Sequence, residues 1–314
     1  MAPRGRGESG RAGRTPPRRA ISPSLRVALL EWRARVRKPG AWQQRKLVKP
    51  NGKTRHLLVP VPALKKVLRE LNRDLLAPLD RHPASFCRRG RGVLLAVRGH
   101  QAHPALLHRD IADFFPSVRP WQVNDALKRC GFDVHDAALI TAVVTTDQQL
   151  PQGSPASVTV GNLVLRSLDI RLSALAKQSG LTYTRYVDDI VVSGGEGRLV
   201  TDEPLIDQII EDCGWRCGSE KGKLYPPSHY REVLGVSVGG AAKPGHKSRQ
   251  KIEDAERKLH DGTLTLADCA SLLHWRDSVT ALGEELDKES ASSLTKEPVS
   301  PISPVVESSP AAGP

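Results

Sequence analysis

The chain has 314 residues, of which 39% are hydrophobic, so it can bury a core and is not a wholly disordered chain. Lys and Arg outnumber Asp and Glu by 47 to 34, and the formal net charge of +13 favours a polyanionic partner, either nucleic acid or an anionic membrane. No apolar run approaches the roughly 20 residues of a spanning helix, and the arginine-rich start lacks the apolar stretch of a signal peptide. We therefore expect a cytoplasmic protein with no membrane partner.

The two ends of the chain differ in composition from its middle. Residues 1–22 are mostly Arg, Gly and Pro, and residues 287–314 are rich in Ser and Pro, so both segments are expected to be disordered tails. The five cysteines form no regular framework and are expected to be free thiols. Cys213, Cys217 and His229 could bind zinc, but no second ligand pair follows them, and ordinary cysteines are the favoured interpretation.

The first predicted elements are a basic hairpin and an amphipathic helix. In RKLVKPNGKTRHLLVP, residues 45–60, the step Asn51-Gly52 separates two strand-like runs and can supply the positive φ angles of a type I′ turn. In PALKKVLRELNRDLLAPL, residues 62–79, leucine and valine recur at i, i+3 and i+4 spacing. This spacing predicts a helix with one buried face, and the Lys and Arg residues between the apolar positions predict a solvated basic face.

The next stretch, ALLHRDIADFFPSVRPWQVNDALKRCG, predicts a buried strand that runs into a helix. The strand is expected over residues 105–115 and contains Asp110 and Asp113. Ser117 is the predicted N-cap of the following helix, and Gly131 is its predicted end.

Asp110 needs an explanation, because a charged residue inside an apolar strand is costly unless it is paired or binds a metal. If this segment stood alone, an ion pair with Arg109 or Lys128 would be the favoured explanation. The rest of the sequence is needed to decide between pairing and metal binding.

A helix start follows in LPQGSPAS, residues 150–157. Ser154 before Pro155 is typical of a helix N-terminus, and the helix is expected to run to about Lys177. Gln152 and Gly153 would let the backbone approach a flat or crowded partner such as a base pair, although an ordinary loop explains Gly-Ser-Pro equally well.

The stretch YTRYVDDIVVSG, residues 183–194, predicts two paired strands with Asp188 and Asp189 at or beside their turn. Aspartates are common in turns, so the pair alone carries little information. With Asp110 on a neighbouring strand, however, the pair supplies hard oxygen ligands of the kind that Mg²⁺ takes alongside water and substrate phosphates. In a two-metal site one ion activates the attacking oxygen and the other stabilises the leaving group, and both need ligands fixed on a rigid framework.

The motifs DIADFFPSV, LPQGSPAS and YVDD, in this order, resemble those of reverse transcriptases, most closely the bacterial group that includes retron and group II intron enzymes. The similarity covers about residues 45–240, and three motifs at matching spacing make it highly specific. It implies an α+β right-hand polymerase fold, with fingers, a palm built on an antiparallel sheet backed by helices, and a short helical thumb. On this basis fingers and palm are expected in residues 23–240 and the thumb in residues 241–286.

The resemblance also implies roles at the metal site. Asp110, Asp188 and Asp189 match the metal-binding aspartates of the family, and the carbonyl of Ile111 matches a backbone ligand of the two Mg²⁺ ions. Lys221 matches a lysine near the pyrophosphate that can donate a proton.

Other matches concern the incoming deoxynucleotide. Phe115 matches the bulky side chain that would collide with a ribose 2′-hydroxyl and so favours deoxynucleotides. Gln152 and Gly153 match the segment that lines the nascent base pair, and Lys53 and Arg55 match basic finger residues that hold the triphosphate.

Basic segments imply contacts to RNA. The stretch that contains Arg88, Arg89 and Arg91 resembles the retron version of the family, in which a histidine stands ten residues before the first aspartate, as His100 does here. A core histidine is the favoured interpretation of His100 without the family. In the expected thumb, the residues that would follow the duplex phosphates are Lys247, Arg249 and Lys251.

The resemblance implies an RNA-directed DNA polymerase of retron type that uses deoxynucleotides and takes a structured noncoding RNA as template and primer. It also suggests a role in antiphage defence with a separate effector protein, because no nuclease or toxin motif occurs in this chain. Ala96, Val97 and Gly218 depart from the retron pattern, so another bacterial type, group II intron-like, diversity-generating or abortive-infection, stays the alternative. A palm-fold nucleotide cyclase and a catalytically inactive RNA-binding protein are disfavoured, because GGDEF-like residues are absent and all three aspartates are present.

Overall fold

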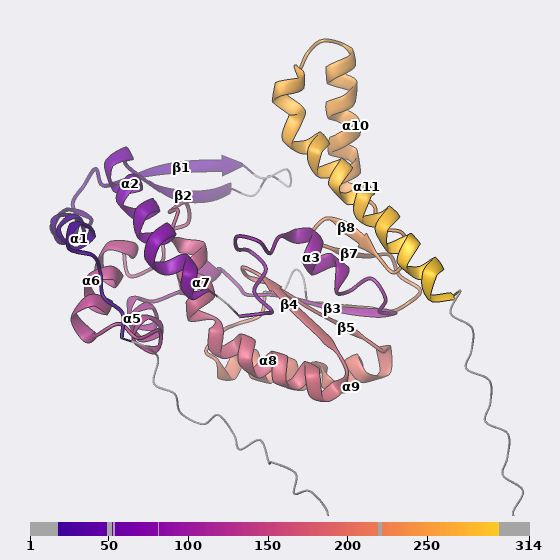
Figure 1. The fold of residues 1–314 in the computed structure, drawn as a ribbon, viewed down its shortest axis with the longest axis horizontal. Helices are drawn as coiled ribbons and strands as arrows, with labels where there is room; N and C mark the ends of the chain where they lie inside the picture. The colour runs from indigo at the N-terminus through magenta and orange to yellow at the C-terminus, as the bar shows by residue number, and fades with distance from the viewer. Residues whose placement is uncertain (1–17, 49–51, 53, 81, 219–221, 295–314) are drawn as a thin grey trace, which may run out of the picture. The chain divides into compact units, whose positions relative to one another are not determined.

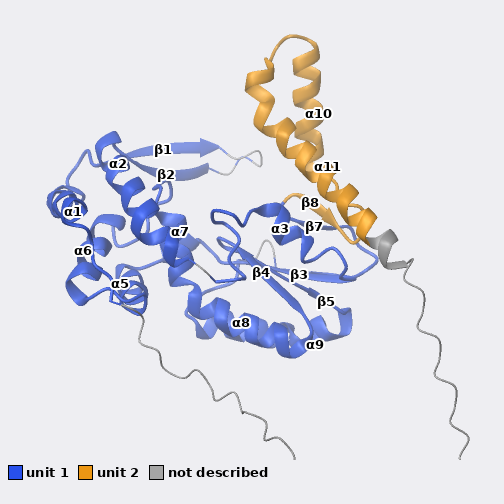
Figure 2. Ribbon diagram, in the orientation of Figure 1, with its two compact units in different colours: residues 1–234 blue, residues 235–314 orange. Residues whose placement is uncertain are grey.

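A computed structural model describes residues 18–48, 52, 54–80, 82–218 and 222–294. The chain forms two compact units, Met1–Leu234 and Gly235–Pro314 (Figure 2). One cluster of buried apolar side chains extends from Ile21 to Trp215 and forms the core of the first unit. None of the described helices is both long and apolar enough to cross a membrane.

The N-terminal segment is more ordered than its composition suggests. Arg19 donates its backbone N–H to the carbonyl of Gly131 over 2.9 Å and its Nε to the carbonyl of Cys130 over 3.1 Å. Ile21 is buried, and helix α1 (Pro23–Arg35) begins directly after Ser22. The expectation of disorder through residue 22 is therefore wrong for residues 18–22, because these contacts hold them against the core. The rest of that tail lies outside the described residues.

The predicted basic hairpin and amphipathic helix are both present. Strand β1 (Trp42–Val48) pairs antiparallel with β2 (Thr54–Pro60), and Val48 lies opposite Thr54. Asn51 lies outside the described residues. Helix α2 (Pro62–Leu71) continues into a π-helical turn, η1 (Asn72–Leu76), and a 3₁₀ turn, η2 (Ala77–Leu79). Of the residues at the predicted spacing, Leu64, Leu68 and Leu71 are buried, whereas Val67 and Leu75 are half-buried. Leu76, which lies in the π-helical turn and outside that spacing, is buried as well.

A four-stranded antiparallel sheet forms the centre of the first unit, in the order β4-β5-β3-β6. Its strands are β4 (Thr182–Tyr186), β5 (Asp189–Gly194), β3 (Ala105–Asp110) and β6 (Lys223–Tyr225). Helices α8 (Arg166–Ser179) and α9 (Glu196–Asp212) lie side by side against one face of this sheet (Figure 1). Two helices therefore cover one face of the sheet that contains the end of β3 and the start of β5.

The remaining elements of the first unit are short helices and one strand. They are α3 (Val93–Arg98), α4 (Phe114–Ser117), α5 (Pro120–Arg129), α6 (Val134–Val144), α7 (Ser157–Val164) and β7 (Arg231–Val233).

Two local predictions near β3 need correction. The strand ends at Asp110 rather than residue 115, and Asp113 has a left-handed φ of 44° at the start of α4. Ser117 does not cap α5, because its hydroxyl donates to the carbonyl of Phe114 over 2.8 Å. The N-cap is Arg119, whose N–H donates to the side chain of Gln122 over 2.7 Å. Gly131 follows the end of α5 with a φ of 99°, as predicted.

The helix predicted from Ser154 begins later and is divided. Helix α7 starts at Ser157, and Ser154 accepts a hydrogen bond from the N–H of Ala156 over 3.3 Å in the preceding turn. Leu165 separates α7 from α8 because its ψ of −2° leaves the helical range. The helical segment as a whole extends to Ser179, close to the predicted end.

The second unit contains β8 (Val236–Val238), α10 (His246–His260) and α11 (Leu266–Leu294). Helix α11 continues past residue 286, so the expectation of a disordered tail from residue 287 is wrong for residues 287–294. Residues 287–294 include the good helix formers Lys, Glu, Ala and Leu and contain neither Pro nor Gly. The first helix-breaking residue of the tail is Pro298. Residues 295–314 lie outside the described residues.

Candidate active site

The register of the central sheet brings the aspartates of two separate motifs together. In the antiparallel pair of β3 and β5, Asp110 lies directly opposite Asp189. Side chains of directly opposed residues project from the same face of a sheet. Beyond the strand, the N–H of Ile111 donates to the carbonyl of Asp188 over 3.1 Å, so the backbone of Asp188 is also tied to the end of β3. All three aspartates are half-buried.

The turn between β4 and β5 is tight and strained. Tyr186 pairs with Asp189, so only Val187 and Asp188 connect the two strands. Val187 has a φ of 61°, which a β-branched residue adopts only at a cost of about 1–3 kcal/mol. Strain of this kind persists only where the surrounding structure imposes it, and it is concentrated at functional sites. The conformation of this turn is thus held by contacts outside it.

Arg185 supplies one of those contacts. Its Nη1 donates to the carbonyl of Val187 over 2.7 Å and to the side-chain oxygen of Asn162 over 2.8 Å. Its Nε and Nη2 donate to both carboxylate oxygens of Asp169 on α8, over 2.8 and 2.7 Å. Arg185 is fully buried, and its bonds to Asp169 and Asn162 are buried with it, whereas its bond to the carbonyl of Val187 is partly buried.

The network around Arg185 is charged and deeply buried. Burial by itself would lower the pKa of the Arg185 guanidinium, but the adjacent Asp169 carboxylate outweighs burial and raises it. Tyr183 donates its hydroxyl to Asp169 over 2.7 Å, and Asn162 donates to Asp80 over 2.7 Å. Burial raises the pKa of the Asp80 carboxyl. Sequence reasoning missed this network, although one charged residue in the apolar run TYTRYV was a signal of it.

The alternative to metal binding was an ion pair between Asp110 and Arg109, but the guanidinium of Arg109 pairs with helix α9. This guanidinium donates to Asp207 over 2.6 and 2.9 Å and to Glu203 over 2.6 Å, both on α9. Consecutive residues of a strand point to opposite faces, so Arg109 and Asp110 are directed apart. The alternative partner, Lys128, is exposed on α5.

The donor set at this edge suits a divalent cation that is shared with its substrate. Among the described residues, no group of three or more His, Cys, Asp or Glu side chains could hold a metal ion by itself, which also leaves the zinc alternative at Cys213 and Cys217 without support. Like-charged carboxylates repel one another where no cation separates them. Mg²⁺ is commonly bound through one or two carboxylates together with waters and phosphates. Asp110 and Asp189, opposed on one face with Asp188 beside them, fit that mode of binding.

The segment that leads to Lys221 lies against the same edge. The N–H of Gly218 donates to the carbonyl of Asp110 over 2.7 Å, and the N–H of Ala112 donates to the carbonyl of Arg216 over 2.8 Å. A Cβ added at Gly218 would lie 3.5 Å from the carboxylate of Asp110, which is ordinary van der Waals contact, so this segment packs directly against the aspartate. Lys221 itself lies outside the described residues.

Phe115 lies on α4, which follows β3 directly, and the 152–153 loop lies against strand β2. Phe115 is half-buried on α4, and its ring centroid lies 5.2 Å from that of the buried Phe114. The N–H of Leu58 on β2 donates to the carbonyl of Gln152 over 2.8 Å, which ties the loop to the hairpin. Gly153 has a φ of 124°, and an added Cβ would meet the carbonyl oxygen of Leu58 at 2.9 Å. Arg55 is exposed on β2, whereas Lys53 lies outside the described residues.

The arginines expected to contact RNA differ in their surroundings. Arg88 donates to the carbonyls of Ser85 and His82, over 3.0 and 3.4 Å. The guanidinium of Arg91 stacks 4.3 Å from the ring centroid of Phe86. Arg89 is the exposed one of the three.

His100 cannot contact nucleic acid as expected, because its side chain is completely buried. Its Nδ1 lies 2.6 Å from the hydroxyl of Ser193 and its Nε2 lies 2.7 Å from the hydroxyl of Thr184. Burial lowers the pKa of His100 to about 3. The residue is a neutral core histidine that joins the segment after α3 to strands β4 and β5, as the alternative interpretation held.

The basic residues expected in the thumb lie in the second unit. Lys247, Arg249 and Lys251 are exposed in the first half of α10. In the second half of this helix, Arg257 and Lys258 form ion pairs with Asp254.

Comparison with known proteins identifies the sequence around this site. Residues 43–238 match the family model described as reverse transcriptase (RNA-dependent DNA polymerase). The retron Mx162 reverse transcriptase of Myxococcus xanthus is 28% identical over 231 residues, which cover 64% of this chain and 48% of that protein. The retron Ec86 reverse transcriptase of Escherichia coli is 28% identical over 213 residues, which cover 67% of this chain and 66% of that protein.

The chain spans from about half to about two thirds of the length of these relatives. Among solved structures, a telomerase from Candida albicans in complex with a fragment of telomeric RNA aligns with a TM-score of 0.48 and 11% identity, over 65% of this chain and 46% of that chain.

Proposed function

This chain belongs to the family of reverse transcriptases, and we propose that it copies an RNA template into DNA at the edge of the central sheet where Asp110, Asp188 and Asp189 meet. The observation that carries the proposal is the pairing of Asp110 with Asp189 in the sheet register. Two motifs that are far apart in the sequence are thereby joined at one point. A purely structural pair of strands would have no reason to oppose two carboxylates, because directly opposed like charges are destabilising.

The three aspartates, with the carbonyl of Ile111, would hold two Mg²⁺ ions. When bound, such ions lower the pKa of the attacking hydroxyl and stabilise the charge on the leaving pyrophosphate. The packing of α8 and α9 against one face of the sheet supports this assignment, because catalytic ligands need a fixed framework. Lys221, which lies outside the described residues, would donate a proton to the pyrophosphate, as the family resemblance implies.

Other residues of the chain would select and orient the deoxynucleotide. The ring of Phe115 would exclude a ribose 2′-hydroxyl by its bulk, and its packing on Phe114 supports a fixed position for this ring. Gln152 and Gly153 would line the nascent base pair. Their bond to β2 supports a coupling between this loop and the hairpin that carries Arg55 and Lys53, the proposed triphosphate ligands.

We further propose that the enzyme is of retron type, with a structured noncoding RNA as template and primer, a role in antiphage defence and a separate effector protein. The support is the similarity to several retron reverse transcriptases. The fingers and palm would comprise residues 23–240 and the thumb residues 241–286, with Lys247, Arg249 and Lys251 along the duplex.

The test is incorporation of deoxynucleotides on an RNA template annealed to a DNA primer. The double variant Asp188→Asn with Asp189→Asn is expected to lose incorporation by at least about a thousandfold, because the neutral amides bind metal ions weakly. Binding of the primer–template should change little. Thermal unfolding of the variant would show that the fold is retained.

The matched control is Asp113→Asn, which removes an exposed carboxylate only three residues from Asp110. Asparagine tolerates the left-handed conformation of this position, so this variant should keep its activity. If the double variant still polymerised, or if Asp113→Asn lost as much activity, the assignment of the site would be wrong.

A further inference from the structure

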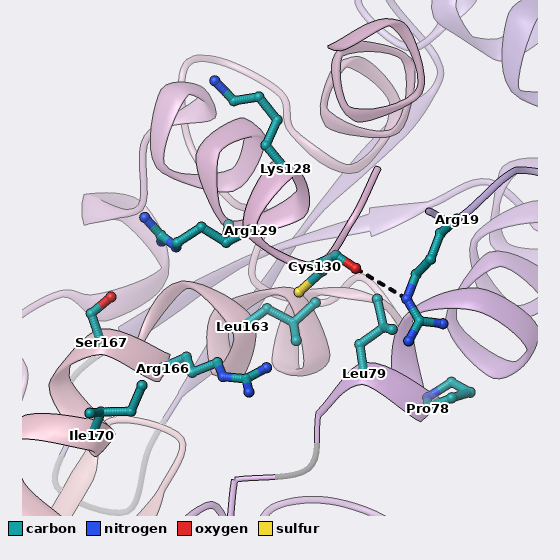
Figure 3. A pocket seen from close by; sticks show the side chains of 11 residues that line it. Arg19, Pro78, Leu79, Lys128, Arg129, Cys130, Leu163, Arg166, Ser167 and Ile170 are labelled. Atoms are coloured by element: carbon teal, nitrogen blue, oxygen red, sulfur yellow. Dashed lines mark hydrogen bonds between the residues drawn. The ribbon is translucent and has the colours of Figure 1, made fainter. Parts of the chain in front are cut away.

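Helix α5 carries a cationic surface that the proposed active site does not use. A cavity of about 630 Å³ lies beside it, and Figure 3 shows two of its lining residues, Leu163 and Cys130, between the side chains of Arg19, Arg129 and Arg166. The cations that line the cavity are Arg19, Lys128, Arg129 and Arg166. No carboxylate is among the residues that line the cavity, so it is suited to an anion.

A second cavity, also of about 630 Å³, adjoins the first, because Lys128 lines both. It adds a further cation, Arg37, and the indole of Trp121. Trp121 is 69% exposed, which is the highest value among the exposed large hydrophobic residues that the structure describes. The one carboxylate among the residues that line the second cavity, that of Asp125, forms an ion pair with Arg129. We call the two cavities together the α5 surface.

Helix electrostatics explains only part of this arrangement. Lys128 and Arg129 lie in the last turn of α5, where cations are favourable, and Arg19 donates to the carbonyl of Cys130 at the same helix end. Arg166, however, follows the residue that joins α7 to α8, so it lies at no free helix end and the helix dipole does not account for it. The tryptophan at position 121 likewise buries only a minor part of its apolar surface in the fold. These two residues therefore point to a ligand.

We propose that the α5 surface binds a single-stranded segment of nucleic acid, with phosphates at Lys128 and Arg166 and an unpaired base stacked on Trp121. A small anion would need only one of the two cavities, whereas a chain of nucleotides can span both across Lys128. Unpaired bases stack on exposed aromatic rings and backbone phosphates follow basic grooves, and a duplex offers such bases only at its ends. This inference deepens the proposed function, because it gives the template a second site outside the polymerising edge.

The test measures the affinity of the full chain for an unstructured RNA oligonucleotide, and separately for DNA of the same sequence, over a range of salt concentrations. Trp121→Ala should weaken binding at least about fivefold, and Trp121→Phe should retain most of the affinity because phenylalanine can still stack. The double variant Lys128→Gln with Arg166→Gln should lower the slope of log affinity against log salt by about 1.4, the value for two phosphate contacts to a single strand.

The matched control is Lys66→Gln with Arg69→Gln, which removes two exposed cations from α2 beside Glu70 and should leave the affinity within about twofold. Losses for RNA alone would identify the template as the ligand, and equal losses for DNA would extend the site to the product strand. Unchanged affinity in both the Trp121→Ala and the Lys128/Arg166 variants would overturn the inference.

Primer extension on a short pre-annealed duplex separates this site from the polymerising edge. The variants of the α5 surface should extend such a duplex at the wild-type rate. An equal loss of extension and of binding would overturn the inference of a separate site. If the wild-type chain failed to extend any primer while Trp121→Ala still weakened binding, the proposed function would fail and the α5 surface would stand.

Discussion

At the residue scale, the clearest pH dependence comes from His100. This buried side chain is held between the hydroxyls of Ser193 and Thr184, and burial lowers its pKa to about 3, against about 6.5 in an unfolded chain. As the pH falls from 7 to 5, the unfolded chain takes up a proton at this residue and the folded chain does not. The free energy of unfolding should therefore fall by about 2 kcal/mol over this range through His100 alone.

Urea unfolding at a series of pH values measures this effect. The variant His100→Asn cannot titrate, so its loss of stability between pH 7 and pH 5 should be smaller than that of the wild type by about 2 kcal/mol. A second variant that cannot titrate, His100→Gln, provides the control, because its pH dependence should match that of His100→Asn. Identical pH dependence in the wild type and His100→Asn would contradict the prediction.

A second residue-scale prediction concerns Arg185, which holds the strained turn before Asp188 through the carbonyl of Val187. Arg185→Lys keeps the charge near Asp169 but cannot reach Val187, Asn162 and both carboxylate oxygens at once. The turn should then relax and displace Asp188. We expect kcat to fall at least about tenfold and the Mg²⁺ concentration for half-maximal activity to rise, because small displacements of catalytic groups are costly.

The control for Arg185 is Tyr183→Phe, which removes a buried hydrogen bond to the same Asp169 but leaves the bond to Val187 intact. Both variants should be less stable than the wild type, and only Arg185→Lys should change the Mg²⁺ dependence. If the two variants shifted the Mg²⁺ dependence equally, Arg185 would support the fold without positioning the turn.

At the element scale, the hairpin β1–β2 and the loop at residues 152–153 are expected to move as one body. Gly153→Ala would bring a Cβ within 2.9 Å of the Leu58 carbonyl and force alanine into a φ of 124°. Urea unfolding should show a loss of about 2–3 kcal/mol from strain and displaced backbone. Gly90→Ala is the control, because its φ of 75° is also positive but nothing lies within 4 Å, so its loss should be about 1 kcal/mol. Equal losses would show that the contact with Leu58 is unimportant.

The sequence was most informative where local rules and hydrophobic pattern agreed. Asn51-Gly52 predicted the hairpin, leucine spacing predicted α2, and Gly131 marked the end of α5. Asp110 was expected on a strand beside the 188–189 turn because three carboxylates suit a metal site, and the family resemblance supported that placement. The register that sets Asp110 opposite Asp189 was not predicted, because local patterns do not relate distant segments.

The predictions that were wrong, and the network that was missed, depend on contacts that the local sequence does not reveal. Ser117 was expected to cap α5, but its hydroxyl donates to a carbonyl in its own turn. His100 was expected at an RNA surface, but two hydroxyls from β4 and β5 make it a satisfied core residue. The Arg185 network unites residues from three elements, so its charge balance is visible only in three dimensions.

At the scale of the whole molecule, the excess of positive charge matters only where cations remain available to a polyanion. Helix α10 contains exposed cations in its first half and ion-paired cations in its second half. Lys247, Arg249 and Lys251 are exposed in its first half, whereas Arg257 and Lys258 are already paired with Asp254. The two halves of one helix therefore allow an internal comparison.

The last prediction uses this comparison. Replacing Lys247, Arg249 and Lys251 together by Gln should lower the slope of log affinity against log salt for a primer–template duplex by up to about 2.7, since each phosphate contact contributes about 0.9. Arg257→Gln with Lys258→Gln should change the slope by less per charge, because Asp254 already neutralises part of that pair. Titrations between about 50 and 200 mM salt would measure both slopes. A larger effect per charge from the second pair would mean that the duplex follows the other half of α10, and the proposed thumb contacts would be wrong.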